Sequence, residues 1–216
     1  MDKVLRAEAL ITKGFMPPSE GDALYLAACE ACKTLPQLPI VEVGTYCGRS
    51  TVWLGAAARK NRTTVFAVDH HFGSEENQQG WEWFDESLID SVTGRLNTLP
   101  KLLETLRRSG LTDVVVPVVG DSKTISSQWS KKVSMCFIDG GHGDQPAQDD
   151  YFGWAPKVAL NGFLAVHDVF ADPKDGGQAP FKYIYSAAID SGEFIELSAT
   201  GSLRILQRIK QPNFKD

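Results

Sequence analysis

The 216-residue sequence lacks an excess of basic residues. It holds 22 Lys and Arg against 27 Asp and Glu, for a formal net charge of −5, and its basic residues are scattered along the chain. Nucleic-acid binding depends on clustered Lys and Arg that neutralise phosphates. We therefore expect no nucleic-acid partner.

Long apolar runs are also lacking. No window approaches the apolar length that crosses a bilayer, and the first segment, MDKVLRAEALITKGF, mixes acidic and basic residues where a signal peptide would have an apolar core. We expect no membrane association and a cytoplasmic location.

Cysteine is scarce, and the chain's four cysteines do not indicate a disulfide framework. Cys29 and Cys32 form a C-x-x-C within an Ala-rich helical stretch, with no second pair to complete a metal site. We interpret them, together with Cys47 and Cys136, as small packing residues.

The sequence does contain an alternation of apolar runs and helix-length segments. The runs are PIVEVG, TTVFAVD, DVVVPVVGD, VSMCFIDG and GFLAVHD. Helices are predicted at Lys3 to Ile11, at about Ala23 to Thr34, in STVWLGAAARK, in LPKLLETLRRSG and around Lys182 to Ser191. Apolar strands separated by helices predict a parallel sheet covered on both faces.

The end of the chain departs from this pattern. EFIELSAT and SLRILQRI are joined at Gly201 and predict an antiparallel hairpin. The expected fold is α/β, a doubly wound, mostly parallel seven-stranded sheet in one domain spanning 1–216, with an N-terminal helical segment at 1–35. The irregular stretch at about 71–96, which contains Trp81 and Trp83, is predicted to be a lid-like insertion or a packed loop.

Chemically active side chains follow the predicted strands. Ligands of open parallel sheets bind beyond the carboxyl ends of the strands. The residues at these ends are Glu42, Gly44, Asp69, His70, His71, Gly120, Asp121, Ser122, Asp139, His142, His167 and Asp168. All four histidines of the chain are among them, and neighbouring charges can tune histidine as an acid, base or ligand. This clustering favours an active site at that edge.

The first strand is followed by the glycine-rich loop V-G-T-Y-C-G-R-S. Its glycines permit close approach of a ligand to the backbone. The glycine spacing does not match the dinucleotide fingerprint G-x-G-x-x-G, and the chain has no phosphate-binding G-x-x-x-x-G-K-[ST] loop. Asp69 has the position and character to accept hydrogen bonds from ribose hydroxyls, a feature that nicotinamide enzymes also have.

Taken in this order, the motifs over about residues 14–208 resemble class I S-adenosylmethionine-dependent methyltransferases. The resemblance is to the O-methyltransferase group that includes catechol and caffeoyl-CoA enzymes, and more closely to its macrolide and aminocoumarin branch. The segment MPPSEGDAL, the run E-V-G-x-x-x-G-x-S, Asp69 and Gly120-Asp121-Ser122 carry it. The cofactor contacts implied by the resemblance are Met16, Pro17, Ser19, Glu42, Gly44, Thr45, Tyr46, Gly48, Ser50, Asp69, His70, Gly120, Asp121, Ser122 and Asp139.

The same resemblance implies the catalytic group. Asp139, His167 and Asp168 occupy the positions that bind a divalent cation, Mg²⁺ or Mn²⁺, although an imidazole is softer than Mg²⁺ prefers. His142 occupies the basic position three residues after Asp139 and is expected to be the general base. His167 is expected to be a ligand or to assist as a second catalytic histidine.

The expected function is S-adenosylmethionine-dependent methylation of a hydroxyl on a small-molecule acceptor, which could be a sugar, a phenol or a secondary metabolite. A nicotinamide-dependent oxidoreductase, a non-catalytic cofactor-binding protein and a metal-dependent hydrolase are the alternatives. Members of this group often associate through the N-terminal segment, so a homo-oligomer is a further open expectation.

Overall fold

One seven-stranded sheet forms the centre of the structure. The computed structural model describes residues 1–141 and 143–211. The strands are β1 (Ile40–Val43), β2 (Val65–Asp69), β3 (Val115–Val119), β4 (Val133–Ile138), β5 (Val158–Val166), β6 (Phe194–Thr200) and β7 (Leu203–Arg208). They lie in the order β3-β2-β1-β4-β5-β7-β6, with β1 to β5 parallel and β7 antiparallel to both of its neighbours. The predicted doubly wound sheet with a C-terminal hairpin is confirmed.

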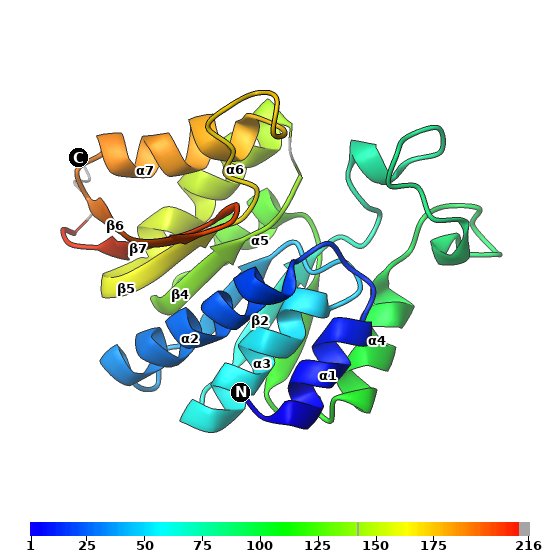
Figure 1. The fold of residues 1–216 in the computed structure, drawn as a ribbon, viewed down its shortest axis with the longest axis horizontal. Helices are drawn as coiled ribbons and strands as arrows, with labels where there is room; N and C mark the ends of the chain where they lie inside the picture. The colour runs from blue at the N-terminus through cyan, green and yellow to red at the C-terminus, as the bar shows by residue number, and fades with distance from the viewer. Residues whose placement is uncertain (142, 212–216) are drawn as a thin grey trace.

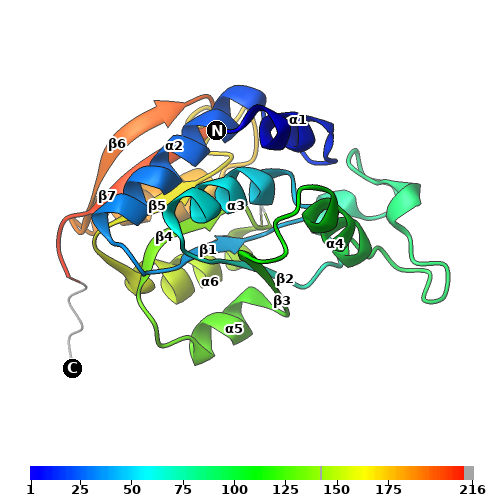
Figure 2. The same ribbon diagram turned by 90° about the horizontal axis from the view of Figure 1, so that it is seen from below.

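Helices cover both faces of this sheet (Figures 1 and 2). The helices are α1 (Lys3–Ile11), α2 (Pro18–Thr34), α3 (Arg49–Asn61), α4 (Leu99–Arg108), α5 (Ser122–Gln128), α6 (Asp144–Trp154) and α7 (Ala187–Asp190). Helices α1 to α4 lie on one side and α5 to α7 on the other. A π-helical segment, Pro180–Ser186, leads directly into α7.

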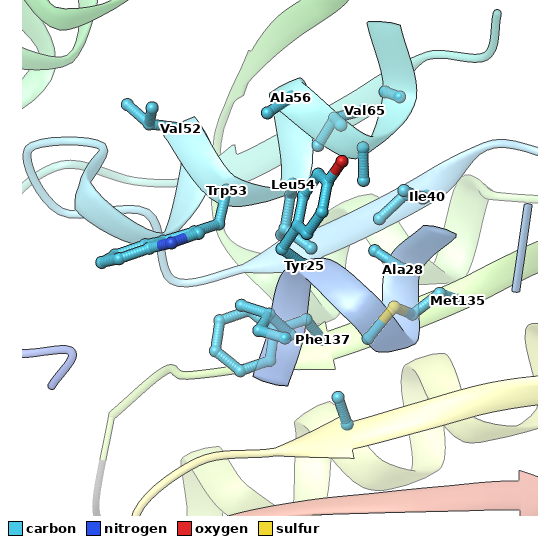
Figure 3. Close-up of a cluster of buried hydrophobic side chains, with 14 of the residues drawn as sticks. Tyr25, Ala28, Ile40, Val52, Trp53, Leu54, Ala56, Val65, Met135 and Phe137 are labelled. Carbon is cyan, nitrogen blue, oxygen red and sulfur yellow. The ribbon is translucent and has the colours of Figure 1, made fainter. Parts of the chain in front are cut away.

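Alternation along the strands divides the apolar residues between two cores. In β4, Met135 and Phe137 belong to the core beneath α2 and α3, whereas Cys136 and Ile138 belong to the core beneath α6 and α7. Figure 3 shows the first core, where Trp53 of α3 is completely buried. Successive side chains of a strand point to opposite faces of the sheet. A strand whose residues are all apolar therefore contributes to both cores.

The cysteines pack in these cores. Cys29 and Cys32 of α2 and Cys136 of β4 are buried and unpaired in disulfides, and Cys47 is buried beneath the insertion at 71–96. The interpretation of the four as packing residues agrees with this burial.

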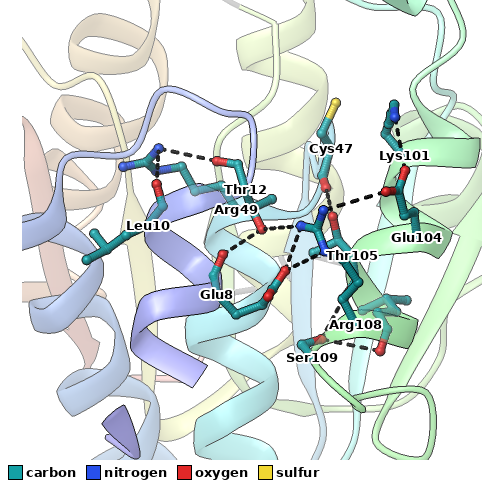
Figure 4. A network of polar contacts seen from close by, with 11 residues as sticks. Glu8, Leu10, Thr12, Cys47, Arg49, Lys101, Glu104, Thr105, Arg108 and Ser109 are labelled. Carbon is teal, nitrogen blue, oxygen red and sulfur yellow. Dashed lines mark hydrogen bonds and ion pairs between the residues drawn. The ribbon is translucent and has the colours of Figure 1, made fainter. Parts of the chain in front are cut away.

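Polar contacts join the N-terminal helix to the rest of its layer (Figure 4). Arg108 of α4 donates to the Glu8 carboxylate of α1 at 2.8 Å. Arg49, at the start of α3, donates to backbone carbonyls at the end of α1. Thr105 of α4 donates to the Cys47 carbonyl at 2.9 Å. These contacts fix the glycine-rich loop between α1 and α4.

Two local features differ from the sequence predictions. Helix α2 begins at Pro18 rather than near Ala23, because Pro17 is its N-cap and a proline is well suited to the first helical position. Helices α5 and α6 were not predicted. The insertion at 71–96 contains two short 3₁₀ turns, Glu75–Asn77 and Glu86–Leu88, and extends away from the sheet in both views.

Within the ranges 1–141 and 143–211, none of the helices combines the length and apolarity that a membrane crossing requires.

Candidate active site

The carboxyl ends of three adjacent strands meet at the predicted edge. Val43 of β1 pairs with Ile138 of β4, and Ile138 pairs in turn with Val166 of β5. The residues that follow, including Asp139 and His167, therefore leave the sheet side by side. This register explains how candidate residues far apart in the sequence form one site.

Gly44 allows the loops after β1 and β4 to touch. Its φ is +85°, and a Cβ at this position would lie 2.1 Å from the carbonyl oxygen of Asp139. The backbone N–H of Asp139 also donates to the Val43 carbonyl at 2.8 Å. Only glycine combines this dihedral angle with so close an approach.

Asp69 organises the glycine-rich loop. Its Oδ2 accepts the backbone N–H groups of Thr45 at 2.8 Å and Tyr46 at 2.9 Å, and its Oδ1 accepts that of His71 at 2.7 Å. Gly48, with φ +93°, is the N-cap of α3 and supplies no capping side chain. The N–H groups at the start of α3 are thus without a side-chain cap, an arrangement that suits an anionic ligand.

Glu42 faces the helical layer rather than the loop. It is fully buried, and its carboxylate accepts hydrogen bonds from Ser50 at 2.6 Å and Thr51 at 2.7 Å. Burial raises the pKa of Glu42 to about 8, although the two hydroxyls oppose that shift. Glu42 and Ser50 join β1 to α3, and a direct cofactor contact from either stays a prediction.

His167 lies among three carboxylates. Its Nδ1 is 2.9 Å from Asp139 Oδ1 and 3.3 Å from Asp168 Oδ2, and its Nε2 is 2.7 Å from Glu20 Oε2. Burial on its own lowers the pKa of His167, but these carboxylates raise it to about 12.

Asp139, His167 and Asp168 form a candidate metal group. One ligand atom from each lies within 4.8 Å of the other two. Asp168 adopts φ +54°, which is uncommon for a residue other than glycine, and strained backbone of this kind is frequent at functional sites. Two carboxylates and one imidazole fit a divalent cation that accepts nitrogen as well as oxygen ligands, such as Mn²⁺.

The predicted contacts at the start of α2 differ in exposure. Pro17 and Ser19 are exposed, whereas Met16 is 2% exposed and belongs to the core beneath α2 and α3. Their cofactor roles stay predictions.

At the end of β3, Gly120-Asp121-Ser122 forms the start of α5. The Asp121 carboxylate is the N-cap and accepts the Thr124 N–H at 2.9 Å. The Ser122 hydroxyl donates to Asp150 and accepts from Trp154 Nε1 at 2.8 Å, so it joins α5 to α6.

The two histidines after β2 differ in environment. His70 is exposed and its ring stacks on Phe72, with centroids 5.7 Å apart. His71 is 1% exposed, its Nδ1 lies 2.7 Å from Thr98 Oγ1, and burial lowers its pKa. His71 thus anchors the insertion, whereas a cofactor contact from His70 stays a prediction.

The insertion packs on the segment before α2. Phe15 contacts the Tyr46 ring at 5.3 Å and the Trp83 ring at 5.1 Å between centroids. Lys13 forms an ion pair with Asp85. A groove of about 490 Å³ runs between these segments. Trp83 is 46% exposed and Trp81 is 52% exposed, so the ring contact with Phe15, and not burial, is what indicates a packing role for Trp83.

Two buried acids near the site were not predicted. Glu20 contacts His167, and Asp150 lines a small cavity with Asp139 and His167. Burial raises the pKa of Asp150 to about 6. Glu20 stands inside the motif MPPSEGDAL, so its position in that motif was the available signal. His142, the expected general base, lies outside the described residues.

Solved structures share this fold. The O-methyltransferase NovP superposes with a TM-score of 0.67 at 17% identity, covering 89% of this chain and 81% of its own. The SAH-bound Podospora anserina methyltransferase PaMTH1 superposes with a TM-score of 0.69 at 14% identity, covering 98% of this chain and 89% of its own. A Bacillus cereus O-methyltransferase in complex with SAH superposes with a TM-score of 0.64 at 17% identity, covering 97% of this chain and 92% of its own. At these identities the likeness establishes the fold.

The matched family model extends from β1 to just beyond β5. It is described as a methyltransferase domain and covers residues 41–169, which is more than half of the chain and includes the glycine-rich loop and Asp139, His167 and Asp168. The resemblance to methyltransferases is confirmed, and the chain belongs to the methyltransferase domain family.

Proposed function

We propose that this chain transfers a methyl group from S-adenosylmethionine to a hydroxyl of a small molecule. The observation that carries the proposal is the placement of Asp139, His167 and Asp168 beside a glycine loop built for close approach of a ligand. The family match supports methyl transfer. The descriptions of NovP and the Bacillus cereus protein as O-methyltransferases, the latter in complex with SAH, support the oxygen acceptor and the cofactor.

The glycine-rich loop and Asp69 are suited to the cofactor. S-adenosylmethionine carries its methyl on a sulfonium, so the protein's task is alignment of the acceptor and removal of a proton. The uncapped N–H groups of α3 suit a carboxylate. Asp69 Oδ1 accepts the His71 N–H and, with two lone pairs, has capacity for a ribose hydroxyl.

Asp139, His167 and Asp168 would hold a divalent cation. A cation bound there would lower the pKa of the acceptor hydroxyl and orient its oxygen. Their donor set favours Mn²⁺ over Mg²⁺, because an imidazole is a softer ligand than Mg²⁺ prefers. His142, three residues after Asp139, is the proposed proton acceptor.

Calorimetry tests the cofactor class first. We expect SAH to bind and NAD to give no heat. Binding of NAD without SAH would support the oxidoreductase alternative, and binding of neither would favour a protein without this catalysis.

Turnover is tested next with S-adenosylmethionine and a panel of phenols, catechols and glycosides, using mass spectrometry to detect the methylated product. EDTA is expected to abolish turnover and Mn²⁺ to restore it. His142→Ala and Asp139→Ala, each shown to fold by circular dichroism, are expected to lose most activity. Full turnover by both variants would contradict the assigned roles, and activity untouched by EDTA would remove the cation.

A further inference from the structure

Glu20 is held in the site from two directions. It lies in the first turn of α2, is 5% exposed, and places Oε2 2.7 Å from His167 Nε2. Its Oε1 accepts the Ser202 N–H at 3.0 Å, and its Oε2 accepts the Ser202 hydroxyl at 3.1 Å. The acid therefore joins α2, the end of β5 and the β6–β7 turn.

The hairpin turn is shaped around this carboxylate. Gly201 has φ +54°, and a Cβ there would lie 2.0 Å from Glu20 Oε1. Any larger residue would push the carboxylate away from its present position. The glycine thus provides both the turn conformation and the space that Glu20 occupies.

Contact with Glu20 determines which nitrogen of His167 is available to a cation. Glu20 Oε2 lies 2.7 Å from His167 Nε2, and a carboxylate oxygen accepts hydrogen bonds, so this contact places a proton on Nε2. The opposite nitrogen, Nδ1, then points toward Asp139 and Asp168. Histidines that bind metals commonly donate their second N–H to a carboxylate, which fixes the tautomer and the ring orientation.

We propose that Glu20 is a positioning residue that holds His167 in the Nε2–H tautomer, so that Nδ1 joins Asp139 and Asp168 in binding a divalent cation. This inference rests on the cation site of the proposed function. Glu20 precedes the region matched by the methyltransferase family model, residues 41–169.

Mn²⁺ binding, followed by the electron paramagnetic resonance of free Mn²⁺, tests the inference without requiring an acceptor. Glu20→Gln keeps the size of the side chain but loses its charge, and we expect it to weaken Mn²⁺ binding by about 10- to 100-fold. Glu30→Gln, on the same helix and exposed, is the matched control and should bind Mn²⁺ like the wild type. SAH affinity should be the same in all three proteins.

A second pair of variants moves Glu20 without removing it. Gly201→Ala should weaken Mn²⁺ binding in the same direction, whereas Gly192→Ala, with φ +64° and no atom within 4 Å of the added Cβ, should not. This comparison separates displacement of the carboxylate from the backbone strain that both substitutions introduce.

Nitrogen-15 NMR of the Mg²⁺-loaded wild-type protein gives a test that does not depend on variant folding. We expect His167 to show a protonated Nε2 and a proton-free Nδ1. The reverse tautomer, or equal Mn²⁺ affinity in wild type and Glu20→Gln, would overturn the inference alone. A wild-type chain that binds SAH but neither cation would overturn the cation site of the proposed function as well.

Discussion

The Ser50 hydroxyl donates to the Glu42 carboxylate at 2.6 Å inside a wholly buried contact between β1 and α3. Burial raises the pKa of Glu42 from 4.5 to about 8. A carboxyl whose pKa is higher in the folded state favours folding fully below about pH 4.5, and this contribution is lost as the pH rises toward 8.

Glu42→Gln removes this titration while keeping the size of the side chain. The variant should gain stability relative to the wild type as the pH rises from about 5 to about 8, by up to roughly 4 kcal/mol. Urea unfolding of both proteins across that range measures the difference. A difference that stays constant with pH would show that Glu42 is already ionised in the folded chain.

Asp69→Asn should weaken SAH binding by about 10- to 100-fold, because an amide accepts hydrogen bonds on only one of its terminal atoms. Either the Thr45 and Tyr46 N–H groups or the His71 N–H would then lose its acceptor. Calorimetry with SAH gives the measurement. Asp113→Asn, an exposed acid paired with Arg59, should bind like the wild type. Equal affinities for both variants would argue against a role for Asp69 in shaping the loop.

Gly44→Ala should destabilise the protein by roughly 3 kcal/mol or more, since it combines a strained positive φ with overlap against the Asp139 carbonyl. Gly110→Ala is the comparison, because its φ is +62° but no atom lies within 4 Å of the added Cβ. It should cost only about 1–2 kcal/mol. Denaturant midpoints measure the loss of stability in both variants. Equal losses would mean that backbone strain alone explains the effect of Gly44→Ala.

Trp83→Ala should loosen the insertion, because it removes the ring contact with Phe15. Limited proteolysis within residues 71–96 should become roughly 2- to 10-fold faster, given the energy of an aromatic pair. Trp81→Ala, which removes an exposed indole 52% accessible to solvent, should leave the rate unchanged. Equal acceleration by both would contradict a specific packing role for Trp83.

Most of the sheet could be predicted because its strands are apolar on both sides. PIVEVG and VSMCFIDG supply alternate residues to two cores, as expected for strands that are covered on both faces. The C-terminal hairpin could also be predicted, from the turn at Gly201 between two strand-like runs. Helix α5, with the sequence SKTISSQ, was missed because a short polar helix has no apolar periodicity and depends on its Asp121 cap.

Only part of the candidate site could be predicted from the sequence. The register of parallel strands brings Asp139 and His167 together, and that rule needs no three-dimensional knowledge. Glu20 was missed as a site residue because its partner His167 is 147 positions away and belongs to another element. The motif MPPSEGDAL marked its segment, but the contact with His167 depends on how α2 packs against the strand ends.

The approach of Gly44 to Asp139 also limits how this scaffold can be recombined. The two loops are in backbone contact, so neither can change its path without displacing the other. A chimera that takes only the loop after β1 from another protein of this fold would place it against a loop after β4 whose backbone path does not fit it. Grafting experiments should therefore exchange residues 44–50 together with the loop after β4.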